Sequence, residues 1–221
     1  MLFNNTHFII PARKGSKGLP KKNQLLLDYT ISKIPEAYHD RVVVSTDDDH
    51  IVEKLKSKWP NCKTHLRSDS SAIDTASTKE CLQEAIDHFS ISGNIVMLYL
   101  TYPERSWEDI TKAYKWFVEK KATSLLCREP LMTHPFLCLY ELDDHRGAQI
   151  TEHDLYRRQD YPKCFKVSHV ISIFKQKELK KLNKNLYNKE TVYYEVNESL
   201  DVDTEEDFKK IKKEKMKRCL K

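Results

Sequence analysis

Short apolar runs alternate with helix-like stretches along the first part of the chain. Buried strands are predicted at residues 7–11, 41–45, 63–66 and 94–100. Helices are predicted between and after them, at residues 25–34, 49–58, 75–89 and 106–120. The last of these has the clearest start, with Ser106 as the N-cap and Asp109 in the first turn. This order predicts an α/β fold, a mostly parallel sheet flanked by helices.

The second half of the chain is less regular. Strands are predicted at residues 122–127, 166–174 and 192–195, a short helix at 175–183 and a closing helix at 204–217. Residues 135–149 read as strands joined by an Asp-Asp-His-Arg-Gly turn, and residues 140–162 break the alternation. We therefore expect a single domain over residues 1–221, with a protruding lobe or oligomer arm at about residues 135–170.

Composition limits the classes of protein to which the chain can belong. Hydrophobic residues make up 39% and charged residues 32%, which suits a folded domain with a real core. The net charge of +5 comes largely from residues 209–221, which hold basic residues without interleaved aromatics or an apolar face. This pattern predicts a solvated helix end, with no nucleic-acid or membrane partner. The six cysteines form no CxxC pair, so we expect reduced thiols in a cytoplasmic protein.

A basic, glycine-containing loop follows the first predicted strand. Only four residues of the chain are glycine, and two of them, Gly15 and Gly18, fall in this loop with one Arg and four Lys. Glycines let backbone N–H groups approach an anion, and the cations neutralise phosphate charge. The loop is neither a Walker A nor a GxGxxG motif, and an ordinary basic surface loop is the alternative. A phosphate site beyond the carboxyl end of a strand is the reading that fits an open α/β sheet.

The run Ile-Pro-Ala-Arg-Lys-Gly-Ser-Lys-Gly-Leu-Pro-Lys-Lys-Asn at residues 10–23 resembles the signature of the CMP-sugar-acid synthetases. These are the cytidylyltransferases that activate N-acetylneuraminate, its relatives and Kdo. The resemblance implies a Rossmann-like nucleotidyltransferase fold in which this loop wraps the CTP triphosphate. It implies a nucleotide-binding set of Ala12, Arg13, Gly15, Ser16, Lys17, Lys22 and Asn23. Arg13, Lys17 and Lys22 would be catalytic, because they would stabilise charge on the leaving pyrophosphate.

Further segments resemble the same family in the same order. Residues 43–48 resemble its second strand and acidic turn. Arg67 followed by Asp-Thr-Ala-Ser-Thr resembles an Arg…Asp-x-Ala-Ser-Ser segment, which implies that Arg67 and Thr78 contact the base and the ribose. Residues 157–162 resemble an Arg-Arg-Gln-Asp-x-Pro run of the acceptor side and dimer arm. The resemblance thus implies a homodimer, with acceptor contacts from Arg157, Arg158 and Gln159.

Two aspartates near the end of the chain predict a metal site. Residues 199–203, Ser-Leu-Asp-Val-Asp, resemble the family's Ser-x-Asp-Ile-Asp metal motif. In an extended segment Asp201 and Asp203 point the same way, and two carboxylates beside phosphate oxygens suit Mg²⁺. The alternative is an acidic N-cap region of the closing helix. We expect Mg²⁺ as the cofactor, these two aspartates as catalytic ligands, and a structural role for Asp207.

The acceptor side departs from the family pattern. Where Leu-Leu-Gln-Pro-Thr-Ser-Pro-Leu-Arg is usual, residues 97–105 keep Thr101, Pro103 and Arg105 but replace the Gln with Tyr99. An Asn-Gly pair is also missing, because residues 167–170 read Val-Ser-His-Val. His134 and His169 could line a pocket, but a packed or surface position is the favoured interpretation for each. We assign Tyr99 and Thr101 to acceptor binding and expect N-acetylneuraminate to be a poor acceptor.

The expected function is therefore transfer of CMP from CTP to a small acidic, nonulosonate-like sugar, with release of pyrophosphate. Two alternatives remain. The same transfer could act on a phosphorylated or non-sialate acceptor in surface-polysaccharide biosynthesis. The chain could also be a catalytically silent nucleotide-binding paralogue, although the phosphate loop and the pair of aspartates argue against that.

Overall fold

The computed structural model describes residues 2–219. Its main sheet has seven strands in the order β3-β2-β1-β4-β8-β5-β9. Their bounds are β1 Thr6–Ala12, β2 Val42–Thr46, β3 Lys63–Leu66, β4 Asn94–Met97, β5 Ser124–Pro130, β8 Phe165–Lys175 and β9 Val192–Glu195. Strand β8 runs antiparallel to both of its neighbours, and every other adjacent pair is parallel. The predicted α/β fold with a mostly parallel sheet is confirmed.

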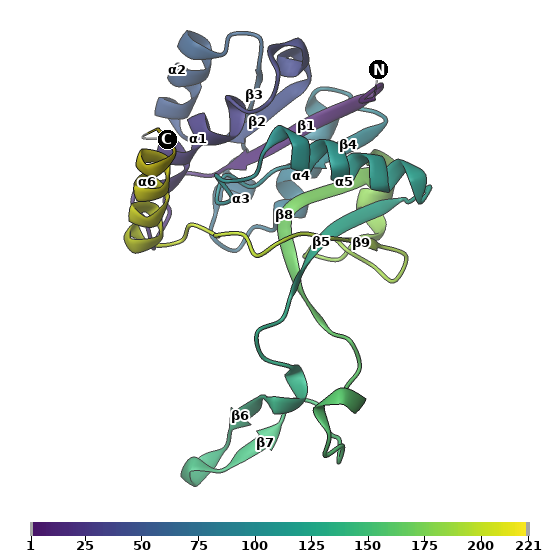
Figure 1. Ribbon diagram of the computed structural model, residues 1–221. Helices are drawn as coiled ribbons and strands as arrows, with labels where there is room; N and C mark the ends of the chain where they lie inside the picture. Colours follow the sequence, from purple (N-terminus) through teal and green to yellow (C-terminus); the bar gives the residue numbers. More distant parts are fainter. Residues whose placement is uncertain (1, 220–221) are drawn as a thin grey trace.

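Helices cover both faces of the sheet (Figure 1). They are α1 Lys22–Ile31, α2 Asp49–Lys58, α3 Asp69–Ala72, α4 Thr78–His88, α5 Trp107–Glu119 and α6 Glu205–Cys219. Along β1, Phe8 and Ile10 enter the larger core with residues of α1, α2, α5 and α6. Ile9 points the other way, into a smaller core with α4. This alternation follows from the two-residue period of a strand and creates two hydrophobic layers.

Some predicted boundaries differ from the observed ones. The helix predicted at 75–89 begins only at Thr78, because Ser77 is its N-cap. The Ser77 side chain accepts from the Glu80 N–H, and the Glu80 carboxylate accepts from the Ser77 N–H. The helix predicted at 175–183 is a 3₁₀ helix, η5, at Gln176–Lys181. Helix α3 and the 3₁₀ helix η1 at Glu36–Arg41 were not predicted. Both are too short to show a clear apolar period.

The segment between β5 and β8 projects from the body as a long arm (Figure 1). It carries the small hairpin of β6 Leu139–Glu141 and β7 Gly147–Gln149, with 3₁₀ turns η2 Pro135–Leu137, η3 Asp143–His145 and η4 Arg158–Asp160. Aromatic packing holds the outer part of the arm together: the Phe136 ring stacks on the His153 ring with centroids 4.1 Å apart, and its centroid lies 5.2 Å from that of Tyr161. Large apolar side chains on the arm remain exposed, among them Met132, Leu139, Ile150 and Tyr156.

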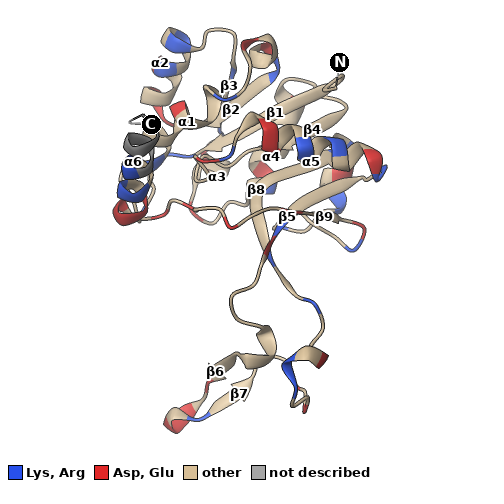
Figure 2. Ribbon diagram, in the orientation of Figure 1, with Lys and Arg blue, Asp and Glu red and all other residues tan. Residues whose placement is uncertain are grey.

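The closing helix begins with acidic residues and continues with basic ones (Figure 2). The basic tail at residues 209–221 lies only partly within the described residues, since residues 220–221 are outside them. Within the described part of the chain, no helix combines the length and the apolar character needed to span a membrane. The cysteines described there, Cys62, Cys81, Cys127, Cys138 and Cys164, are all free thiols.

Candidate functional site

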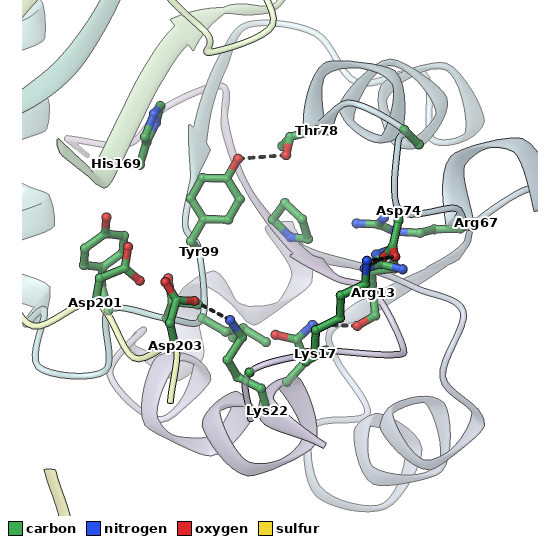
Figure 3. A pocket seen from close by; sticks show the side chains of 18 of the residues that line it. Arg13, Lys17, Lys22, Arg67, Asp74, Thr78, Tyr99, His169, Asp201 and Asp203 are labelled. Atoms are coloured by element: carbon green, nitrogen blue, oxygen red, sulfur yellow. Dashed lines mark hydrogen bonds and ion pairs between the residues drawn. The ribbon is translucent and has the colours of Figure 1, made fainter. Parts of the chain in front are cut away.

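One open cavity of about 740 Å³ lies where β1 and β4 end (Figure 3). The predicted residues that line it are Arg13, Ser16, Lys17, Lys22, Asn23, Arg67, Thr78, Tyr99, Thr101, Asp201 and Asp203. They come from the loop after β1, the first turn of α1, the end of β3, the start of α4, the segment after β4 and the segment before α6. The fold therefore gathers distant sequence motifs around a single space.

Hydrogen bonds hold the loop after β1 against its neighbours. The Asn23 side-chain amide donates to the Arg13 carbonyl oxygen at 2.7 Å. The Lys14 backbone N–H donates to the Asp47 carboxylate, also at 2.7 Å, from the acidic turn after β2. Helix α1 starts at Lys22, so its positive N-terminal end lies at the cavity. Such a helix end favours an anion, which suits a phosphate group.

Cations of this loop are paired with a carboxylate from the opposite wall. Arg13 and Lys17 both bind Asp74, and Lys17 Nζ lies 2.7 Å from Asp74 Oδ2. The hydrogen bond from Lys17 and the nearby charge of Arg13 lower the pKa of Asp74. A bound triphosphate would compete with Asp74 for the Arg13 and Lys17 cations. Asp74 was not predicted as a site residue, although it stands in the family-like segment after Arg67.

Both metal-motif aspartates face the cavity (Figure 3). Val202 between them is fully buried, and its N–H donates to the Thr101 carbonyl oxygen at 2.8 Å, so the expected alternation is confirmed. Lys22 Nζ lies 2.7 Å from Asp203 Oδ1. The cap of α6 is formed by Thr204, whose Oγ1 accepts from the Asp207 N–H at 3.2 Å, while the Asp207 carboxylate accepts from the Thr204 N–H at 3.1 Å. Asp207 is structural as expected, and Asp203 is left for the cavity.

Arg67 and Thr78 are fixed on the wall formed by β3 and α4. Arg67 donates to the carbonyl oxygens of Ser45 at 3.3 Å and Ser71 at 3.1 Å. The Tyr99 hydroxyl donates to Thr78 Oγ1 at 2.7 Å. Burial raises the pKa of Tyr99, so the phenol stays protonated. This hydrogen bond links Thr78, expected to contact the nucleotide, to Tyr99, expected to contact the acceptor.

Several predicted residues lie outside the cavity lining. The Ala12 side chain is fully buried, and its carbonyl oxygen accepts from Thr46 at 2.7 Å. Gly15 shapes the loop with φ +79, a conformation that favours glycine. The predicted acceptor residues of the arm, Arg157, Arg158 and Gln159, lie in or next to η4, away from this cavity. Arg157 there pairs with Asp160 at 2.8 Å.

Gly18, which was singled out in the phosphate loop, lines the cavity as well. Other residues of the lining were not assigned to the site from the sequence: Pro11, Ala76, Leu100, Tyr102, His169 and Asn185. Ala76 and Tyr102 lie within the family-like runs, so those runs could have indicated them. Asn185 comes from the loop after η5, and no motif marks it. His169 lines the cavity, which was the less favoured of its two interpretations. Burial, with the Asp201 charge, raises the pKa of Tyr102.

A basic loop, a helix N-terminus and a pair of carboxylates around one cavity define a nucleotidyltransferase type of site. A family model described as cytidylyltransferase matches residues 7–221, and the chain belongs to this family. It is thus a member of a family of CTP-dependent nucleotidyltransferases.

Relatives and solved structures agree with this assignment. The chain is 29% identical over 214 residues to post-translational flagellin modification protein B of Campylobacter coli, covering 90% of each. It is 28% identical over 212 residues to N-acylneuraminate cytidylyltransferase of Streptococcus agalactiae, of which it spans only 51%. It is 27% identical over 169 residues to pseudaminic acid cytidylyltransferase of Campylobacter jejuni, covering 71% of this chain and 72% of that one. The fold matches CMP:2-keto-3-deoxy-manno-octonic acid synthetase complexed with CTP at a TM-score of 0.71, with 15% identity over 97% of this chain and all of that one.

Proposed function

We propose that this protein transfers CMP from CTP to an acidic, nonulosonate-like sugar and releases pyrophosphate. The observation that carries the proposal is that the phosphate-loop cations and the pair Asp201 and Asp203 line the same cavity. Relatives named for N-acylneuraminate and pseudaminic acid support this class of acceptor. The reaction would take place in the cytoplasm.

The proposed chemistry needs positioning and charge neutralisation more than covalent work by the protein. An oxygen of the acceptor attacks the α-phosphorus of CTP in line, and the bond to the bridging oxygen of pyrophosphate breaks. Arg13, Lys17 and Lys22 would stabilise the charge that develops on the pyrophosphate. Arg67, Thr78 and Asn23 would hold the nucleoside, because they line the same cavity beside the loop.

Mg²⁺ is proposed as the cofactor because the donor set fits it. Asp201 and Asp203 offer hard oxygen ligands on the same side of an extended segment. No group of three or more His, Cys, Asp or Glu suited to a metal occurs among the described residues, so phosphate oxygens and waters would complete the coordination. This is the usual manner in which Mg²⁺ binds beside phosphates. When bound, the ion would polarise the α-phosphate and neutralise its charge.

A homodimer is proposed from the arm. Its apolar side chains Met132, Leu139, Ile150 and Tyr156 are exposed, and Met132 and Tyr156 are more than nine-tenths so, at 93% and 95%. The acceptor-side residues expected on the arm do not reach the cavity of their own chain. An arm that packs on a second copy would bury the apolar side chains and could bring those residues to the partner's cavity. Sedimentation at micromolar concentration should give a dimer, and a monomer would contradict this proposal.

Pyrophosphate release by the purified protein tests the proposed function. CTP and Mg²⁺ are supplied with N-acetylneuraminate, pseudaminic acid or a phosphorylated polyol such as erythritol 4-phosphate, each in turn. We expect release that depends on a sugar acid. Release only with the phosphorylated polyol would move the acceptor to the alternative class. CTP binding without release from any acceptor would favour a silent nucleotide-binding protein.

A further inference from the structure

Strand β8 carries an irregularity next to the cavity. On its partner β5, Leu126 pairs with Ser172 while the next residue, Cys127, pairs with Ser168. Residues 169–171 of β8 therefore have no counterpart on β5. Such bulges redirect side chains and are frequent beside active sites. Here the first bulged residue is His169, and its side chain lines the cavity.

A buried guanidinium holds this bulge in place. Arg105, only 6% exposed, donates from Nη1 to the Val170 carbonyl oxygen at 2.6 Å. Its Nη2 donates to the Tyr99 carbonyl oxygen at 3.1 Å. Burial lowers the pKa of Arg105 to about 10, so the group remains charged at neutral pH. One side chain thus fixes the two backbone segments that carry Tyr99 and His169.

The His169 ring presents an unused hydrogen-bonding group at this wall. The ring packs edge-on against Tyr99, with centroids 5.8 Å apart and an interplanar angle of 85°. Its Nδ1 atom is buried and has no hydrogen-bond partner within the described chain. A buried polar atom without a partner loses its hydration and gains nothing in return. The ring as a whole is partly exposed and lines the cavity, so a ligand bound there can contact it.

The surroundings of His169 suit an uncharged ligand group. Burial lowers the pKa of His169, and the Asp201 carboxylate opposes this only in part, so the imidazole is neutral at neutral pH. A neutral imidazole offers one donor and one acceptor. Within the described chain, Asp201 is the only charge with a resolved effect on this ring. An amide or hydroxyl would find a matching donor or acceptor on this ring.

We propose that His169 determines acceptor specificity: it hydrogen-bonds to an uncharged N-acyl or hydroxyl substituent of the sugar acid. This rests on the proposed function and deepens it. Tyr99 forms the neighbouring wall, and Arg105 is a positioning residue that acts through the bulge.

The test compares His169→Phe and His169→Asn with the wild type. Phenylalanine keeps a ring of similar size without hydrogen bonds, and asparagine keeps a donor and an acceptor. With the sugar acid that the wild type uses best, kcat/KM should fall about 10- to 100-fold in His169→Phe, the scale of one lost specific contact. His169→Asn should recover part of the loss. The KM for CTP should stay within about twofold of the wild-type value in both variants. The control is His88→Phe, which changes an exposed histidine of α4 and should leave kcat and both KM values within about twofold of the wild type.

Different outcomes separate this inference from the proposed function. If His169→Phe leaves the acceptor kcat/KM unchanged, or shifts the CTP KM equally, the inference is wrong while cytidylyl transfer stands. A wild type that prefers erythritol 4-phosphate over N-acetylneuraminate and pseudaminic acid also overturns the inference. If no acceptor yields pyrophosphate although CTP binds, the proposed function itself fails, and the role of His169 falls with it.

Discussion

The backbone of Gly18 lies directly against the main-chain carbonyl of Asp203. A Cβ atom at position 18 would stand 2.4 Å from that oxygen, closer than any real Cβ contact. The ion pair between Lys22 and Asp203, at 2.7 Å, spans the same junction. The phosphate loop and the carboxylate segment are therefore in contact, and their spacing depends on the absence of a side chain at residue 18.

Gly18→Ala should push the two segments apart and lower kcat by about 10- to 100-fold, because small misplacements of reacting groups are costly. Initial rates with saturating CTP and acceptor provide the measurement. Gly147→Ala is a suitable control, since its added Cβ would meet the flexible Leu139 side chain on the arm at 3.1 Å. A Gly18→Ala enzyme with wild-type kcat would show that the junction does not set the geometry.

Asp201→Asn and Asp203→Asn should each lower turnover by at least about 100-fold, the scale of losing one key electrostatic group. Both side chains are exposed at the cavity, so the free energy of unfolding should change little. Asp207→Asn is the matched control: it changes the carboxylate that accepts from the Thr204 N–H and hydroxyl, so it should lower stability slightly and keep turnover. Rates in excess Mg²⁺ and urea denaturation separate the two effects. Near-normal turnover in both cavity variants would refute the metal assignment.

Asp74→Asn should bind inorganic pyrophosphate about two- to fivefold more tightly than the wild type. The carboxylate of Asp74 competes with phosphate for Arg13 and Lys17, and exposed ion pairs of this kind are weak. Isothermal titration with pyrophosphate measures the affinity directly. Asp69→Asn, an exposed carboxylate outside the cavity lining, should leave it unchanged. Weaker binding by Asp74→Asn would mean that Asp74 organises the loop rather than competing with the ligand.

Stability should fall as the pH drops below about 6.5, in part because of His65. Its side chain is 4% exposed, and Nδ1 lies 2.9 Å from Ser45 Oγ. Burial lowers the pKa of His65 from 6.5, with Arg67 and His88 acting in the same direction and Glu84 opposing them. Between the lowered folded value and about 6.5 the unfolded chain binds more protons, so acid favours unfolding.

Urea denaturation at pH 7.5, 6.5 and 5.5 measures this dependence. His65→Gln should reduce the loss of unfolding free energy between pH 6.5 and 5.5, because the ionisable group is gone. His50→Gln removes an exposed histidine of α2 and should leave the slope as it is. Identical slopes for wild type and His65→Gln would contradict the role given to His65.

The sequence predicted a site residue where the local pattern of residues is enough to fix the direction of its side chain. The two-residue period of an extended segment was enough to direct Asp201 and Asp203 to one side, with Val202 buried between them. The phosphate loop could be recognised because its glycines and cations all fall within residues 13–22. In contrast, the direction of the His169 side chain depends on a register shift between β8 and β5, and no residue near His169 in the sequence predicts this shift.

The same limit explains the other misses. Asn185 lies in the loop after η5, which is tied to α4 because Lys79 donates to the Leu182 carbonyl oxygen at 2.5 Å. That contact joins residues about a hundred positions apart, which periodicity cannot predict. The short helix α3 was missed because four residues are too few to show a period.

The central claim is that this cavity couples CTP to a sugar acid, and the direct measurement is product formation with each nucleotide in turn. Purified protein, Mg²⁺ and the best sugar acid are incubated with CTP, UTP, ATP or GTP, and the nucleotide-linked sugar is detected by mass spectrometry. A CMP-linked product that forms from CTP far faster than its counterparts, and that is lost in Asp203→Asn, is the predicted result. Equal product from all four nucleotides, or none from CTP, would contradict the claim.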